Sequence, residues 1–368
     1  MTLALERSSQ LIDVSGDWLD LPSAPIVRAA AKAALDAGET HYTTRPGINP
    51  LREAIAAKLA NENGINIDPL AEVLVTCGGQ EALFVALNVL LSKGDQALLV
   101  GPQSVRHAAI IALAGGEPTP VAADLDAGLT VDPARAAAQL SDRARMLIVE
   151  TPSYAGSTID EATLGELAKL AVERELVVVA LEGLEPFVHD GARHVSIGSL
   201  PGMAERTVTI NGFSAAYGLR GWRVGYMAGP RALLQPITQL KQALTICTTA
   251  VSQYAALAAV ANRHEIVPAA QRAVAERRAR ALAALEDAGI SHLRPSGGMH
   301  VMLDARGHAG GAAAALHAAA EDGVRLASGS DIGVPDWLRL SLTRPPEVVE
   351  EAIARLVRIL GKEGETHG

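Results

Sequence analysis

The chain has 368 residues, of which 49% are hydrophobic and 20% are charged, and this composition is typical of a soluble globular protein with a substantial core. Its 32 lysines and arginines against 41 aspartates and glutamates leave a formal charge of −9, which argues against a nucleic-acid-binding protein. Two cysteines cannot form a disulfide framework, so we expect a reducing, cytoplasmic environment. No apolar run reaches the roughly 20 residues that span a membrane, and residues 1–10 lack the pattern of a secretory signal.

Most of the chain alternates between short apolar runs, which indicate buried strands, and longer stretches in which apolar residues have helical spacing. The predicted strands cover residues 72–77, 96–100, 145–150, 176–181 and 206–211. Predicted helices include residues 29–37, 49–59 and 78–91. Continuously apolar strands separated by helices favour a mostly parallel α/β sheet with helices on both faces.

The pattern changes after about residue 262, where the strands become fewer and the helices more charged. The predicted elements are a long helix at 266–287, a strand at 299–303, a helix at 312–320, a strand at 337–342 and a closing helix from Pro345. This order predicts a smaller α+β lobe. No low-complexity linker precedes it, so we expect the two parts to pack closely.

Four segments carry most of the functional information: His41–Glu53, Thr76–Leu83, Asn211–Tyr226 and Trp337–Ser341. In content and order they resemble the conserved blocks of the class I/II aminotransferases, which are fold type I enzymes that depend on pyridoxal phosphate (PLP). The resemblance implies a three-layer α/β/α large domain at residues 44–262 and a small domain built from residues 1–43 and 263–368. It also implies a homodimer with its sites at the interface.

The segment Asn211–Tyr226 resembles the loop whose lysine forms a Schiff base with the cofactor, but Ala215 stands at the lysine position. Leu181 and Leu184 stand where the family places an aspartate for the ring nitrogen and a tyrosine for the ring oxygen. Tyr154 stands where the family has an asparagine. A methyl group cannot form an imine or move a proton. Our main hypothesis is therefore a pseudoenzyme, or a re-purposed PLP-independent enzyme of small-molecule biosynthesis, in which ordinary transaminase activity is not expected.

The groups that would bind anions are kept. Resemblance places a phosphate on Gly79, Gln80, Ser214, Arg223 and, from the neighbouring subunit, Tyr42. Backbone N–H groups at a helix N-terminus and a guanidinium suit that role. The resemblance also places a ligand carboxylate on Arg339. We therefore expect an anionic small-molecule ligand, with no covalently bound cofactor but with PLP, or another phosphate-bearing molecule, able to bind non-covalently.

Three further side chains are candidates for catalysis near the emptied ring site: Tyr154, Glu182 and His300. A carboxylate or imidazole in an apolar pocket can act as an acid or base. Each also has a simpler interpretation. Tyr154 could fill vacated space, Glu182 matches a residue common in ordinary aminotransferases, and His300 could be a hydrogen-bonded packing residue. No His, Cys or carboxylate spacing resembles a metal site.

Two alternatives to the main hypothesis stay open. The first is a PLP-dependent aminotransferase acting on an amino acid/2-oxo acid pair, for which Lys241 is the only plausible substitute lysine. The second is a non-catalytic partner subunit that stabilises an active relative. Ala215 and Leu181 separate the first alternative from the main hypothesis, whereas nothing in the sequence separates the second from it.

Overall fold

A computed structural model describes residues 11–361. The expectation that residues 1–10 do not form a secretory signal therefore lies outside the described residues. The helices in this part of the chain are α2 (Pro25–Asp36), α3 (Asn49–Lys58), α4 (Gly79–Leu90), α5 (Val105–Leu113), α6 (Pro133–Gln139), α7 (Glu161–Glu173), α8 (Arg231–Thr245), α9 (Ala250–Ala261), α10 (Arg263–Asp287), α11 (Gly311–Glu321) and α12 (Pro346–Leu360). Short helices are η1 (Leu59–Asn63), η2 (Ile197–Ser199), η3 (Arg220–Trp222) and η4 (Gly329–Ile332). The strands are β1 (Ile12–Asp13), β2 (Val73–Thr76), β3 (Gln96–Val100), β4 (Glu117–Val121), β5 (Ala144–Glu150), β6 (Val177–Leu181), β7 (Thr207–Gly212), β8 (Gly225–Ala228), β9 (His292–Leu293), β10 (His300–Asp304), β11 (Val324–Arg325), β12 (Ala327–Ser328) and β13 (Trp337–Ser341).

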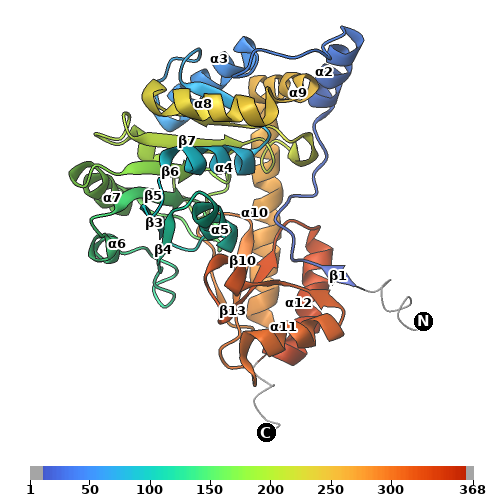
Figure 1. The fold of residues 1–368 in the computed structure, drawn as a ribbon. Helices are drawn as coiled ribbons and strands as arrows, with labels where there is room; N and C mark the ends of the chain where they lie inside the picture. Colours follow the sequence, from blue (N-terminus) through green and yellow to red (C-terminus); the bar gives the residue numbers. More distant parts are fainter. Residues whose placement is uncertain (1–10, 362–368) are drawn as a thin grey trace.

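Seven strands form the large sheet in the order β2-β8-β7-β6-β5-β3-β4 (Figure 1). The neighbours from β7 to β4 pair in parallel, whereas β8 runs antiparallel to both β2 and β7. This confirms the prediction of a mostly parallel α/β sheet. Parallel strands end at the same edge of a sheet, and ligands of such folds bind beyond that edge.

Helices cover both faces of the large sheet because alternate residues of its strands point to opposite sides. In β5, Met146 and Ile148 pack in the cluster that contains residues of α4, α5 and α8. Leu147 and Val149 pack in the cluster that contains residues of α6 and α7. These four side chains are fully or almost fully buried, which explains why the strand reads as one continuous apolar run.

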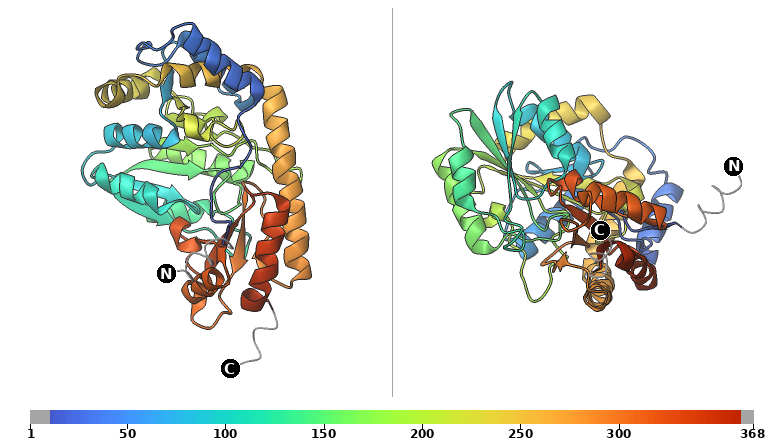
Figure 2. Two further views of the ribbon diagram at one scale, coloured as in Figure 1. Left: turned by 90° about the vertical axis from the view of Figure 1, so that its right-hand side faces the viewer. Right: turned by 90° about the horizontal axis from the view of Figure 1, so that it is seen from below.

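The second structural part of the molecule is a smaller lobe. It is built around the antiparallel sheet β12-β13-β10-β9 and the parallel pair β1-β11. The long helix α10 runs from the large-sheet half to this lobe, where it lies beside α12 (Figures 1 and 2). Helix α2 packs against α9 on the large-sheet half, although it follows the small-lobe strand β1 in the chain. The division of the chain at residues 44 and 262 stays a prediction.

Two of the elements that differ from the sequence-based expectations do so for an identifiable physical reason. Strand β4 contains Pro118 and Pro120, which remove strand hydrogen-bond donors and are tolerated because β4 lies at the edge of the sheet. Helix α3 continues into a π-helical turn, Leu59–Asn63, before Gly64 ends it in the left-handed conformation.

Among residues 11–361, none of the helices combines the length and the apolar character that a membrane span needs.

Candidate active site

A cavity of about 500 Å³ lies beyond the carboxyl ends of the parallel strands, between the large sheet and the small lobe. Glu150, Leu181 and Asn211 line it from the ends of β5, β6 and β7. Gly79 and Gln80 reach it from the start of α4. The small lobe contributes Arg339 of β13 and Asp331 of η4, and the connection from β1 to α2 contributes Asp17 and Trp18.

One end of this cavity carries the groups that resemblance assigns to a phosphate. Gly79, Gln80, Ser214 and Arg223 all line it. The first N–H groups of a helix have no partner within the helix, so the start of α4 offers donors to an anion. Gly78 has a φ of 87°, and a Cβ at this position would lie 2.6 Å from Nη2 of Arg223. Glycine at position 78 therefore lets the Arg223 guanidinium approach the start of the helix, where Nη2 donates to the carbonyl of Cys77 at 3.2 Å.

The middle of the cavity is apolar where the sequence departs from the family pattern. Ala215, Leu181 and Leu184 all line it, and Leu181 and Leu184 are 8% and 3% exposed. Of the lysines within residues 11–361, none lines this cavity. Lys241, the substitute that the sequence suggests, is fully buried elsewhere, and its Nζ lies 3.4 Å from Oγ1 of Thr248.

The opposite end holds an ion-paired cluster around Arg339. Nη2 of Arg339 lies 2.8 Å from Oδ1 of Asp17, and Nε2 of His300 lies 3.2 Å from the same oxygen. Burial alone would raise the pKa of Asp17, but His300 and Arg339 together hold it below its ordinary value. Tyr154 lies near both of these groups, with its ring centroid 5.7 Å from that of His300 and 6.0 Å from the Arg339 guanidinium carbon. Burial raises the pKa of Tyr154 and lowers that of His300.

Glu150 is a buried carboxyl that faces this cavity from the end of the central strand β5. Its Oε2 is buried without a hydrogen-bond partner among the described residues. Burial raises the pKa of Glu150 to about 8; the nearby Arg339 opposes that shift and Asp17 adds to it. Asn211, at the end of β7, also leaves its buried Nδ2 unpartnered among the described residues. Orphaned buried polar atoms at a cavity wall favour a polar ligand.

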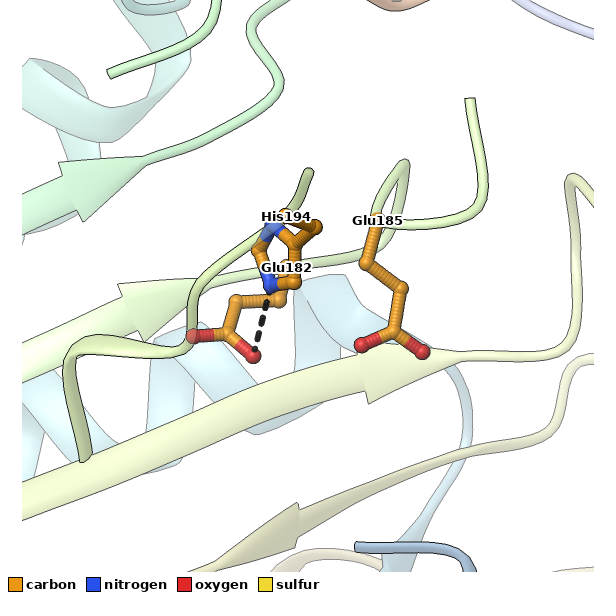
Figure 3. A group of neighbouring side chains, drawn as sticks. All are labelled: Glu182, Glu185 and His194. Atoms are coloured by element: carbon orange, nitrogen blue, oxygen red, sulfur yellow. Dashed lines mark ion pairs between the residues drawn. The ribbon is translucent and has the colours of Figure 1, made fainter. Parts of the chain in front are cut away.

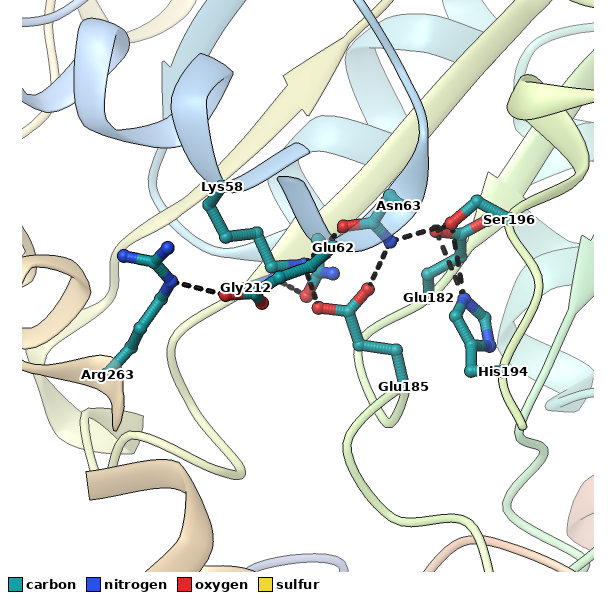
Figure 4. A network of polar contacts seen from close by, with 10 residues as sticks. Lys58, Glu62, Asn63, Glu182, Glu185, His194, Ser196, Gly212 and Arg263 are labelled. Carbon is teal, nitrogen blue, oxygen red and sulfur yellow. Dashed lines mark hydrogen bonds and ion pairs between the residues drawn. The ribbon is translucent and has the colours of Figure 1, made fainter. Parts of the chain in front are cut away.

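Glu182 does not line the cavity. It belongs to a buried polar network that includes His194, Ser196 and Asn63 (Figures 3 and 4). Oε2 of Glu182 accepts from Oγ of Ser196 at 2.7 Å and lies 3.4 Å from Nε2 of His194. Burial would lower the pKa of His194, but the hydrogen bond and charge of Glu182 raise it overall. Potential metal-ligand atoms of Glu182, Glu185 and His194 lie within 4.8 Å of one another (Figure 3).

The carboxylate of Glu185 is already held on the other side of this network. Lys58 forms an ion pair with it, and Nδ2 of Asn63 donates to its Oε2 at 2.7 Å. Burial would raise the pKa of Glu185, but Lys58 lowers it overall. Nζ of Lys58 also donates to Oδ1 of Asn63 at 2.7 Å. The network thus contains its own cation, and its polar groups stabilise one another without an added ion.

The remaining sequence-predicted residues are placed as follows. His300 contacts Tyr154 and Asp17 from behind the cavity wall and is fully buried. Tyr42 lies outside this cavity and is 80% exposed. Three carboxyls line the cavity without having been predicted from the sequence: Asp17, Glu150 and Asp331. Glu150 carries a usable signal, since it ends an apolar strand of a parallel sheet, whereas nothing in the sequence distinguishes Asp17 from other loop aspartates.

The chain is similar to known proteins over almost its whole length. The family described as "Aminotransferase class I and II" matches residues 13–356. The aspartate/prephenate aminotransferase of Thermus thermophilus is 32% identical over 366 residues, covering 98% of this chain and 94% of that protein. The aspartate aminotransferase of Pyrococcus abyssi is 32% identical, covering 91% and 87%. The structure of the Thermus thermophilus aspartate aminotransferase with maleate superposes with a TM-score of 0.93 at 31% identity, covering 97% and 94%.

These relatives correct the main hypothesis from the sequence. A pseudoenzyme or PLP-independent enzyme that has lost conventional PLP chemistry is contradicted, because proteins that match nearly the whole chain are named as aminotransferases. They support instead the alternative of a PLP-dependent aminotransferase. The hypothesis was wrong because it rested on a few substituted side chains in the middle of the cavity, above all Ala215 and Leu181, whereas the similarity extends over almost the whole chain. This chain belongs to the class I and II aminotransferase family.

Proposed function

We propose that this chain is a PLP-dependent aminotransferase that acts on an amino acid/2-oxo acid pair. The observation that carries the proposal is a single cavity with a phosphate-type cradle at Arg223 and a carboxylate-type guanidinium at Arg339. The names of the relatives, which include aspartate, aspartate/prephenate and arginine–pyruvate aminotransferases, support the reaction class and leave the particular amino acid open.

The residues present fit PLP as a non-covalent ligand. Gly79, Gln80, Ser214 and Arg223 would hold its phosphate, and the apolar wall at Leu181 suits the face of an aromatic ring. Three or four charge-assisted hydrogen bonds, each worth about 1.5–3 kcal/mol, are enough for micromolar binding, which needs roughly 8 kcal/mol. The residues do not fit a covalent link, because position 215 has only a methyl group and no described lysine lines the cavity.

When bound, the cofactor supplies the carbonyl that accepts the amino group and the ring that delocalises the resulting electron pair. The side chains of this protein would bind and orient the partners. Arg339 binds the substrate carboxylate as a planar fork, and Leu181 with Leu184 excludes water from the reacting region. Glu150, which lines the cavity, holds a proton at neutral pH because burial raises its pKa to about 8. Because the positioned amine is missing at Ala215, we expect turnover to be slow, since positioned proton transfer usually contributes about 10²–10⁴-fold.

We further propose that the protein is a homodimer in which Tyr42 of one subunit reaches the phosphate end of the other subunit's cavity. The support is its position in a block that resembles the family's phosphate-contacting tyrosine, together with its 80% exposure in the single chain. A large aromatic side chain so exposed is uncommon unless a partner covers it.

The test is transfer of ¹⁵N from labelled amino acids to 2-oxo acids, followed by mass spectrometry, with the purified chain saturated with PLP. Free PLP at the same concentration is the control for uncatalysed exchange. We expect label transfer above that control and loss of transfer in Arg339→Gln. Transfer no faster than with free PLP would overturn the proposed reaction. After borohydride treatment and denaturation we expect the cofactor to separate from the chain, and its retention on a peptide would overturn the non-covalent assignment.

A further inference from the structure

The Arg339 guanidinium already has a carboxylate partner from its own chain. Its Nη2 lies 2.8 Å from Oδ1 of Asp17, and the Arg339 side chain is only 6% exposed. Asp17 is 33% exposed and lines the cavity, whereas its Oδ1 is buried beside Arg339 and His300. The contact therefore occupies the group that the proposed function assigns to the substrate carboxylate.

Asp17 is held at this position by the backbone on both sides of it. The amide of Val14 donates to the carbonyl of Arg325 at 3.0 Å, and the amide of Asp20 donates to the carbonyl of Thr343 at 3.2 Å. Next to Asp17, the ring of Trp18 lies under the Arg220 guanidinium, with 3.5 Å between the guanidinium carbon and the ring centroid. The segment is thus fixed at residues 14 and 20, and the Asp17 carboxylate lies on the short stretch between them.

The Arg339 fork is not saturated by this contact. Its Nε is buried and has no hydrogen-bond partner among the described residues. A planar guanidinium is best satisfied by a bidentate carboxylate, which Asp17 in its present position does not provide. A ligand carboxylate could complete the fork, but only by sharing or displacing Asp17, because two carboxylates at one guanidinium repel each other.

We propose that Asp17 is a specificity-determining residue that competes with ligand carboxylates for Arg339. Its carboxylate lowers the affinity of the cavity for any ligand that uses Arg339, because such a ligand must share the guanidinium with Asp17 or displace it. The inference rests on the proposed function in one respect, namely that Arg339 is the group that receives the substrate carboxylate. The apparent association constant equals the intrinsic one multiplied by the fraction of molecules in which the binding group is free.

The test is the affinity of the protein for succinate, measured by calorimetry without PLP and therefore independent of amino transfer. Asp17→Asn removes the charge and keeps the shape and the side-chain oxygen, so the fold is least disturbed. We expect tighter binding by about 5- to 150-fold, the usual range of coupling between two sites. Asp331→Asn is the matched control, because Asp331 lines the same cavity without an ion pair to Arg339. It should change the affinity less than about 3-fold by the loss of charge alone.

Two further variants assign the effect to Arg339. In an Arg339→Gln background, Asp17→Asn should not increase the affinity for succinate, because the guanidinium for which Asp17 and the ligand compete is absent. Asp17→Glu keeps the charge and should bind succinate as weakly as the unaltered protein. Unchanged or weaker binding by Asp17→Asn would overturn the proposal and indicate that Asp17 only orients Arg339. An equal gain in Asp331→Asn would overturn it as well, whereas failure of amino transfer alone would bear on the proposed function only.

Discussion

Glu150→Gln is expected to remove a large pH dependence from the stability of this protein. The ordinary pKa of a glutamate is 4.5, and burial raises that of Glu150 to about 8 in the folded chain. A group whose pKa is raised by folding stabilises the native state fully below the unfolded value and loses that contribution as the pH rises through the folded value. Between about pH 5 and pH 8 the loss is three units at about 1.36 kcal/mol each, or roughly 4 kcal/mol.

The assay is urea unfolding of both proteins at several pH values, followed by tryptophan fluorescence. Other titrating groups contribute equally to both proteins, so the difference in unfolding free energy isolates Glu150. We expect the variant to gain on the unaltered protein by roughly 4 kcal/mol over this pH interval. Asp331→Asn, whose carboxylate is exposed at the rim of the same cavity, should leave the pH slope unchanged. Parallel curves for the Glu150 variant and the unaltered protein would refute the reasoning.

Three other perturbations test the remaining parts of the structure. Lys58→Met should lower the free energy of unfolding by about 3–5 kcal/mol in urea titrations, because it leaves Glu185 buried without its cation. The double variant Lys58→Met/Glu185→Leu should recover most of this loss, because it also removes the buried charge. Arg223→Gln should weaken PLP binding about 10- to 150-fold in equilibrium dialysis, since one charge-assisted hydrogen bond to phosphate contributes about 1.5–3 kcal/mol. Because folding raises the pKa of His194, this histidine should stabilise the fold fully below pH 6.5, its ordinary pKa. The stabilisation should be lost as the pH rises through the raised pKa, and the melting temperature of His194→Gln should not show that loss.

Five of the seven strands of the large sheet could be predicted from continuous apolar runs, whereas the buried strand β8 (Gly225–Ala228) is not among the predicted strands. The apolar run at 145–150 becomes β5 (Ala144–Glu150), and that at 176–181 becomes β6 (Val177–Leu181). The edge strand β4 (Glu117–Val121) could not be found this way, because its burial is partial and two of its five residues are prolines. Hydrophobic periodicity reports burial, so it is least informative for a strand such as β4 that is only partly buried.

The candidate site shows a similar division between local and long-range information. Residues such as Gly79 and Arg223 could be identified because each lies in a local sequence block with a recognisable backbone role. The contact between Asp17 and Arg339 joins residues far apart in the chain, and neither block hints at the other. The same holds for Glu150, whose pKa depends on the burial that the folded chain creates. Contacts of this kind follow from tertiary packing and have no local sequence signal.

The charge of the cavity is opposite to that of the chain as a whole. Four arginines line it, at positions 106, 220, 223 and 339, whereas the lining acids are Asp17, Asp331 and Glu150. With the pKa of Glu150 near 8 and that of His107 near 4, both groups are uncharged at neutral pH. Two positive charges then remain in a chain whose formal charge is −9. A cationic cavity in an acidic protein concentrates anions locally. Ionisation of Glu150 above about pH 8 would halve that charge, so PLP affinity should fall there in the unaltered protein and hold in Glu150→Gln, a difference that equilibrium dialysis measures directly.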